Sequence, residues 1–101
     1  MNLRLIVFFA FLATVSTTQA RITTIHPSTN IHCGTYDAPI SECGATKLLG
    51  YDMAGAKIVY EGQTVIFYNE ADCTGYGASL QWSVDCFELP FRPKCVFIEC
   101  Y

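Results

Sequence analysis

Six cysteines in a chain of 101 residues constrain the fold of this protein more than any other feature. An even number of cysteines in a short exported chain is typical of disulfides, because so small a domain buries only a modest core. A zinc site is the alternative, but the cysteines are spread evenly and form no paired C-x-x-C motifs. The sequence therefore predicts three disulfides and no metal site. The six residues are Cys33, Cys43, Cys73, Cys86, Cys95 and Cys100.

The first twenty residues have the pattern of a secretory signal peptide. Arg4 gives a short positive start, Leu5–Ala13 is an unbroken apolar run, and small residues precede a cleavage site after Ala20. The apolar run is too short for a membrane span, which needs about twenty residues. We therefore expect residues 1–20 to be removed and residues 21–101 to form one secreted, extracellular domain, in the apoplast if the source is a plant. No transmembrane segment is expected in the mature chain.

The charge of the mature part narrows the choice of partners. Without Arg4, five Lys and Arg residues stand against nine Asp and Glu residues, a net charge of −4 with neutral histidines. Nucleic-acid binding is disfavoured, because counterion release requires a basic face. Simple attraction to anionic lipid is weakened for the same reason.

The strongest strand signal is the stretch Ile58–Cys73. Two β-branched and aromatic runs, Lys57–Tyr60 and Thr64–Tyr68, flank Glu61-Gly62-Gln63, where glycine can take a positive φ. This pattern predicts a β-hairpin that leads into a polar corner at Cys73.

Further short strands are predicted on both sides of this stretch. They cover Arg21–His26, a few residues near Ile40, Gly77–Val84 and Cys95–Cys100, and no segment has a helical apolar period. Asp85–Lys94 is expected to be a loop. We expect an all-β sandwich or barrel. We expect the following residues to pack in the core or at the rim of the barrel: Leu48, Leu49, Tyr51, Tyr60, Phe67 and Trp82.

Several motifs together resemble the macadamia-type plant antimicrobial proteins, also called β-barrelins. The resemblance covers most of the mature chain and implies a small Greek-key β-barrel like one βγ-crystallin domain. Nine residues separate the first two cysteines, as in that family. The remaining matches are Ser41-Glu42-Cys43-Gly44, Tyr60-x-Gly62-Gln63-Thr64, Tyr68-Asn69, Cys73-x-Gly75 and Phe97-Ile98-x-Cys100.

Three departures from the family pattern affect the disulfides and the charge. Ala45 stands where the family has a cysteine, Cys95 stands where it has a small polar residue, and this chain is acidic where known members are basic. The resemblance implies the bridges Cys33–Cys86 and Cys43–Cys100. It leaves Cys73 and Cys95, which we expect to form a replacement bridge if their Cα atoms lie within about 7 Å.

One loop has the composition of a binding tip. It combines apolar residues with two of the five mature cations, and an apolar wedge with cationic flanks suits a microbial surface or a protein partner. The alternative is that the apolar residues cap one end of the barrel. The tip residues are Phe87, Leu89, Phe91, Arg92 and Lys94.

Catalysis and metal binding find little support in the sequence. His26 and His32 could serve a ribonuclease-like reaction with Glu42 or Glu88 and Arg92, but two surface histidines are the preferred interpretation. Glu70 and Asp72 lack the Ser/Thr ending of a crystallin-type calcium site. We expect no enzyme activity, no cofactor and no bound metal.

The resemblance implies a defence protein that inhibits fungi or other microbes outside the cell. The alternative is a secreted protein-binding module of the same fold, such as an inhibitor of a microbial hydrolase or an apoplastic effector. Expected partners are therefore a microbial cell surface or a secreted microbial protein, and a monomer is expected.

Overall fold

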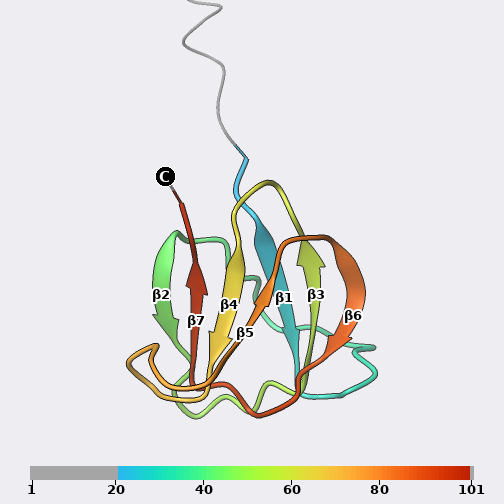
Figure 1. The fold of residues 1–101 in the computed structure, drawn as a ribbon. Helices are drawn as coiled ribbons and strands as arrows, with labels where there is room; N and C mark the ends of the chain where they lie inside the picture. Colours follow the sequence, from blue (N-terminus) through green and yellow to red (C-terminus); the bar gives the residue numbers. More distant parts are fainter. Residues whose placement is uncertain (1–20, 101) are drawn as a thin grey trace, which may run out of the picture.

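The structure is a computed structural model that describes residues 21–100; the predicted signal peptide lies outside the described residues. Every regular element of the described part is a β-strand (Figure 1). This confirms the predicted all-β class. In chain order the strands are β1 (Thr24–Ser28), β2 (Gly44–Lys47), β3 (Gly55–Val59), β4 (Val65–Tyr68), β5 (Gly77–Leu80), β6 (Val84–Glu88) and β7 (Cys95–Ile98).

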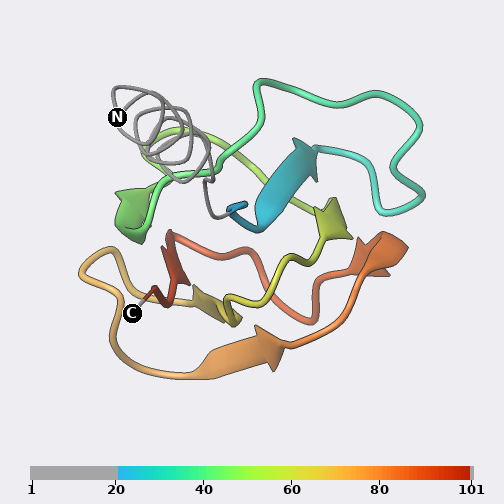
Figure 2. The same cartoon turned by 90° about the horizontal axis from the view of Figure 1, so that it is seen from above.

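The strands form two antiparallel sheets that face each other (Figure 2). One sheet has the order β1-β3-β6 and the other the order β2-β7-β4-β5. Among the described strands, only β4 and β5 are neighbours both in the chain and in a sheet; every other connection crosses from one sheet to the other. The two packed sheets and the connections that cross between them form a small sandwich-like barrel.

The predicted hairpin around Gly62 is wrong, although both of its strands exist. β3 pairs with β1 and β6, whereas β4 pairs with β5 and β7 in the opposite sheet. Gly62 does take a positive φ of 116°, but it serves an arch between the sheets. Both strands have an apolar face, and placing them in opposite sheets lets those faces meet across the core.

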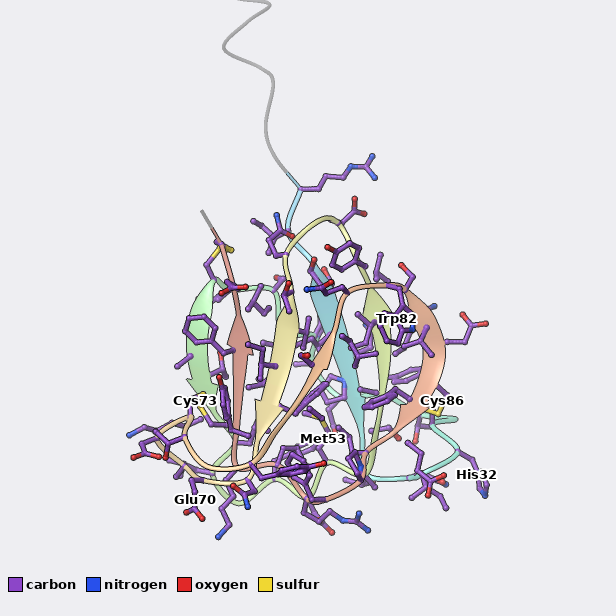
Figure 3. The ribbon with its side chains drawn as sticks, viewed as in Figure 1. His32, Met53, Glu70, Cys73, Trp82 and Cys86 are labelled. Atoms are coloured by element: carbon purple, nitrogen blue, oxygen red, sulfur yellow. A yellow bond between two sulfur atoms is a disulfide. The ribbon has the colours of Figure 1, made fainter. Side chains whose placement is uncertain are left out.

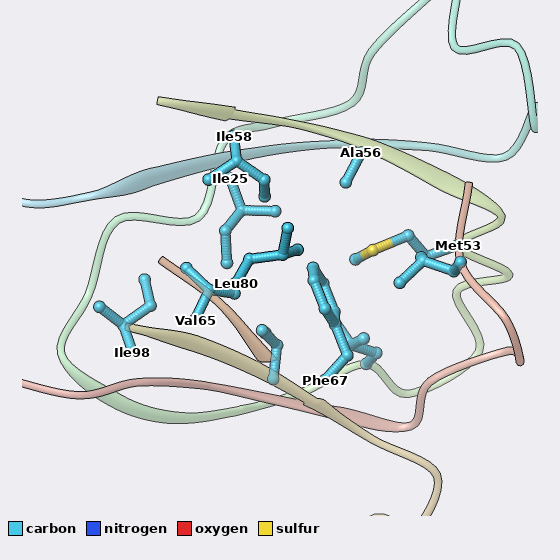
Figure 4. Close-up of a cluster of buried hydrophobic side chains, with 11 residues drawn as sticks. Ile25, Met53, Ala56, Ile58, Val65, Phe67, Leu80 and Ile98 are labelled. Carbon is cyan, nitrogen blue, oxygen red and sulfur yellow. The ribbon is translucent and has the colours of Figure 1, made fainter. Parts of the chain in front are cut away.

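The core fills the space between the two sheets (Figure 4). Ile25 and Ile58 come from one sheet, and Val65, Phe67 and Ile98 come from the other. Inward residues alternate with outward ones, as β4 shows with buried Val65 and Phe67. The full cluster is Ile25, Leu48, Met53, Ala56, Ile58, Val65, Phe67, Leu80, Leu89, Val96 and Ile98.

Three segments differ from the sequence-based prediction. The expected strand Gly77–Val84 is split, because β5 ends at Leu80 and β6 begins at Val84 in the other sheet. Trp82 therefore lies in a crossing connection and is 57% exposed, not packed in the core. β6 also occupies the first part of the predicted loop. β2 was not predicted, because its sequence GATK lacks an apolar pattern and it is held at a sheet edge by pairing with β7.

The N-terminal strand is shifted and contains a proline. β1 runs from Thr24 to Ser28, so Pro27 lies within it. Proline is tolerated because β1 is an edge strand with one continuous partner, β3. The short strand expected near Ile40 is reduced to a single bridge, in which Ile40 and Ile25 exchange backbone hydrogen bonds of 2.8 Å in both directions.

Three disulfides join the six cysteines. They are the two bridges that the family resemblance implies and the expected replacement bridge. Their Cα–Cα distances are 5.9 Å for Cys33–Cys86, 5.7 Å for Cys43–Cys100 and 5.0 Å for Cys73–Cys95. The first two link the β1–β2 connection to β6 and to the C-terminal segment. The third holds the β4–β5 loop against the start of β7. Figure 3 shows Cys73 and Cys86 on opposite sides of the barrel.

Candidate functional site

The five predicted tip residues do not form one exposed loop. Phe87 lies on β6, and its ring stacks on Phe67 with a centroid separation of 6.2 Å. Leu89 is 4% exposed and belongs to the core, so it is not available for binding. Phe91 is half-buried against the same core. The apolar residues of this segment thus cap the barrel, while Arg92 and Lys94 remain exposed.

The exposed apolar surface beside Arg92 and Lys94 comes from other loops. Leu49 is 78% exposed and Tyr76 is 63% exposed, and the Tyr76 ring packs edge-on against Phe91 at 5.2 Å. We call this end of the barrel the loop end. It consists of the β2–β3, β4–β5 and β6–β7 connections, which all lie at the lower end in Figure 1: residues 48–54, 69–76 and 89–94.

Sequence reasoning missed this surface because it assigned Leu49 to the core with Leu48. Leu48 is indeed buried, whereas Leu49 points outward. The available signal was Gly50, which has a positive φ of 71° and turns the chain directly after the two leucines. The Tyr51 amide donates to the Leu48 carbonyl at 3.2 Å, which closes a β-turn over residues 48–51 with Leu49 and Gly50 at its centre and leaves Leu49 exposed.

Of the two cations at the loop end, one is paired with a carboxylate and the other is not. Arg92 Nε lies 3.0 Å from Asp52 Oδ1, so these two charges offset each other. Lys94 forms no ion pair with any of residues 21–100. Its backbone is fixed, because its N–H donates to Tyr68 and its carbonyl accepts from Leu48. Lys94 therefore presents an unpaired cation on a fixed backbone, at an end of the barrel whose β4–β5 connection also carries the exposed acidic residues Glu70 and Asp72.

A cavity of about 310 Å³ opens at the loop end. Its walls are residues 48–52, Ala71 and residues 92–94, one segment from each of the three connections. A second cavity, of about 240 Å³, lies on the other side of Leu48 and Leu49, between β1 and the end of β2. Tyr51 lines both cavities.

Tyr51 carries a polar atom that its surroundings do not satisfy. Its hydroxyl is shielded from solvent and has no well-oriented hydrogen-bond partner among the described residues. Burial raises the pKa of Tyr51 above its ordinary value, and the neighbouring Asp37 carboxylate adds to the rise. The phenol is therefore neutral at physiological pH.

The two histidines lie in different settings. His26 is on β1, with its ring edge-on to Tyr36 at 6.0 Å. His32 lies in the β1–β2 connection and projects outward (Figure 3). Within residues 21–100, no group of three or more His, Cys, Asp or Glu side chains has the arrangement of a metal site. At the polar corner, the Asp72 carboxylate accepts a hydrogen bond from the Thr74 hydroxyl, and Asn69 Oδ1 accepts one from the Tyr76 amide.

A comparison with known protein families matches residues 23–100, the whole barrel, to MiAMP1. The chain belongs to the MiAMP1 family. This is the macadamia-type antimicrobial family that the cysteine spacing and the Tyr60–Gln63 motif resemble, so that resemblance is confirmed. Membership also agrees with the all-β architecture and the three disulfides described above.

One curated relative is "Antimicrobial peptide 1" of Pinus monticola. It is 33% identical to this chain over 69 residues, which cover 67% of this chain and 66% of the relative. The match therefore spans just under two thirds of the relative's length. No solved structure matches this chain significantly. In the described part, no helix is long and apolar enough to cross a membrane.

Proposed function

We propose that this protein is a secreted defence protein that inhibits the growth of fungi or other microbes outside the cell. The observation that carries the proposal is the match of the whole barrel, residues 23–100, to an antimicrobial family. The name of the pine relative supports the same role.

Secretion is supported by two independent features. Residues 1–20 have a signal-peptide pattern, and all six cysteines are joined in disulfides, which persist in oxidising compartments such as the cell exterior. We infer that the active form is the oxidised barrel without its first twenty residues.

The loop end is the part of this barrel that we expect to contact the microbe. It combines the two most exposed large apolar side chains of the described chain, Leu49 and Tyr76, with Arg92 and Lys94. Disruption of a membrane by overall positive charge is disfavoured, because the mature chain carries a net charge of −4. A local contact through an exposed apolar edge does not depend on net charge.

The experiment is a growth-inhibition assay with fungi and bacteria. The oxidised protein is expected to inhibit growth, and the reduced and alkylated protein is expected to be inactive because it loses its fold. Absence of inhibition by the oxidised protein at any soluble concentration would contradict the defence role.

A pair of variants tests the loop end separately. Leu49→Ser is expected to reduce inhibition several-fold without changing Tm, since Leu49 is 78% exposed. Trp82→Ser is the matched control, because Trp82 is also exposed but lies in the β5–β6 connection at the opposite end. Equal losses in the two variants would remove the loop end as the contact surface.

A further inference from the structure

The larger cavity at the loop end has walls that are mainly apolar. Leu48, Leu49, Ala71 and Pro93 contribute aliphatic surface, and Tyr51 contributes a neutral aromatic ring. Its volume of about 310 Å³ is at the lower end of the range for ligand pockets, which is about 300–1,000 Å³. A cavity of this size and character suits one small apolar group.

The charges on the cavity wall select the head group of such a ligand. The wall carries Arg92, Lys94 and Asp52, a net charge of +1. Asp52 is bound to Arg92 at 3.0 Å, so Lys94 is the charge that remains without a partner among the described residues. One negative charge on the ligand would complement it.

The cavity is held open by covalent and backbone constraints. The Cys73–Cys95 bridge fixes the loop that carries Ala71 to the residue next to Lys94. Backbone hydrogen bonds join Lys94 to Tyr68 at 2.9 Å and Leu48 to Lys94 at 3.0 Å. Little ordering is therefore needed on binding, which favours affinity for a small ligand.

The net charge of the protein distinguishes a free ligand from a bilayer. An anionic bilayer would repel a chain with nine acidic and five basic residues as a whole. A single anionic head group at the cavity meets Lys94 on the wall, whereas the acidic neighbours Glu70 and Asp72 flank Ala71 without lining the cavity. Charges farther away than about 8 Å are largely screened at physiological ionic strength.

We propose that the loop-end cavity binds a free single-chain amphiphile with one negative charge, of the fatty-acid class. The apolar chain enters between Leu49, Ala71 and Pro93, and the carboxylate lies against the Lys94 ammonium. This inference goes beyond the proposed function, since binding is independent of whether the protein inhibits growth.

The test is a titration of the oxidised protein with dodecanoate below its micellar concentration, followed by NMR. Saturable one-to-one binding is expected, with the largest amide shifts at Leu49, Ala71 and Lys94. Dodecanol and dodecyltrimethylammonium are expected to bind at least several-fold more weakly, because neither supplies a negative charge to Lys94.

Variants separate the roles of charge and shape. Lys94→Gln is expected to raise the Kd for dodecanoate about tenfold, through loss of a charge-assisted contact. Lys57→Gln removes the same charge from β3 in the opposite sheet and should leave Kd unchanged. Ala71→Leu places bulk on the cavity wall from an exposed position, so it should weaken binding while the protein stays folded.

Four outcomes would overturn the proposal. These are no saturable binding of dodecanoate, equal weakening by Lys94→Gln and Lys57→Gln, equal affinity for the cationic amphiphile, and binding to phosphatidylglycerol vesicles without binding to monomeric dodecanoate. The growth assay is a separate measurement, so a protein that binds dodecanoate but does not inhibit growth would contradict only the proposed function.

Discussion

At the scale of single residues, the Tyr51 hydroxyl is the buried side-chain polar atom of the described chain whose hydrogen bonding is incomplete. Within residues 21–100 no group is well oriented to hydrogen-bond this hydroxyl, although the Asp37 carboxylate lies near it. A hydroxyl that is shielded from solvent and lacks a well-oriented partner lowers stability, whereas the Asp37 carboxylate beside it favours the protonated phenol. Tyr51 lines both cavities, and this position gives a reason why a tyrosine is found there.

Replacing Tyr51 by phenylalanine tests this account through pH. The folded protein keeps the phenol neutral, so its pKa is higher in the folded state than in the unfolded chain, where it is about 10. Below pH 10 the phenol is protonated in both the folded and the unfolded state, so it adds no pH dependence to the free energy of unfolding. As the pH rises above 10 the unfolded chain ionises first, and the wild type loses stability.

We therefore expect Tyr51→Phe to match or slightly exceed the wild-type free energy of unfolding at pH 7, and to lose less of it between pH 9 and pH 11. Urea titrations at each pH measure this difference, and the other tyrosines cancel in the comparison. Parallel pH profiles for the two proteins would contradict the raised pKa.

At the scale of elements, the arch between β3 and β4 is one of the connections that join the two sheets. Gln63 stabilises it, since Gln63 Oε1 accepts hydrogen bonds from Thr23 N at 2.7 Å and from Thr23 Oγ1 at 2.8 Å. Thr23 is fully buried, and its hydroxyl oxygen also accepts from the amides of Glu61 and Gln63. The arch is thus bound to the segment before β1.

Removing the Gln63 side chain should leave this network incomplete. We expect Gln63→Ala to lower the free energy of unfolding by about 1–3 kcal/mol, because the buried Thr23 donors lose their acceptor. Gln81→Ala is the matched control, since Gln81 is exposed and makes one hydrogen bond, to Thr64 at 3.2 Å. Chemical denaturation under non-reducing conditions gives both values, and an equal cost for the two variants would show that the arch does not depend on Gln63.

At the scale of the whole molecule, the disulfides close loops of different length. The paired cysteines are separated by 53 residues for Cys33–Cys86, 57 for Cys43–Cys100 and 22 for Cys73–Cys95. Closing a longer loop removes more entropy from the unfolded chain. The bridge that departs from the family pattern is therefore the one with the smallest expected effect on stability.

Deleting each bridge as an alanine pair tests this order. We expect a loss of about 3 kcal/mol for Cys73→Ala with Cys95→Ala, and about 4 kcal/mol for Cys43→Ala with Cys100→Ala. Differential scanning calorimetry of the two variants gives the comparison. The reverse order would indicate that local packing around Cys95, which is buried, outweighs loop length.

The sequence by itself determined the all-β class, the presence of three disulfides and the family. Apolar alternation in the segments of β4 and β7 is a local property of the chain, and the Cys–Gly and Tyr–Gly–Gln motifs are readable without coordinates. Tertiary structure decided which strands pair, because β3 and β4 carry the same local pattern whether they share a sheet or face each other across the core. Tertiary structure also decided which residues form the loop end. Leu48 is buried and Leu49 exposed by the turn at Gly50, and three connections far apart in sequence form one cavity only once both sheets are packed.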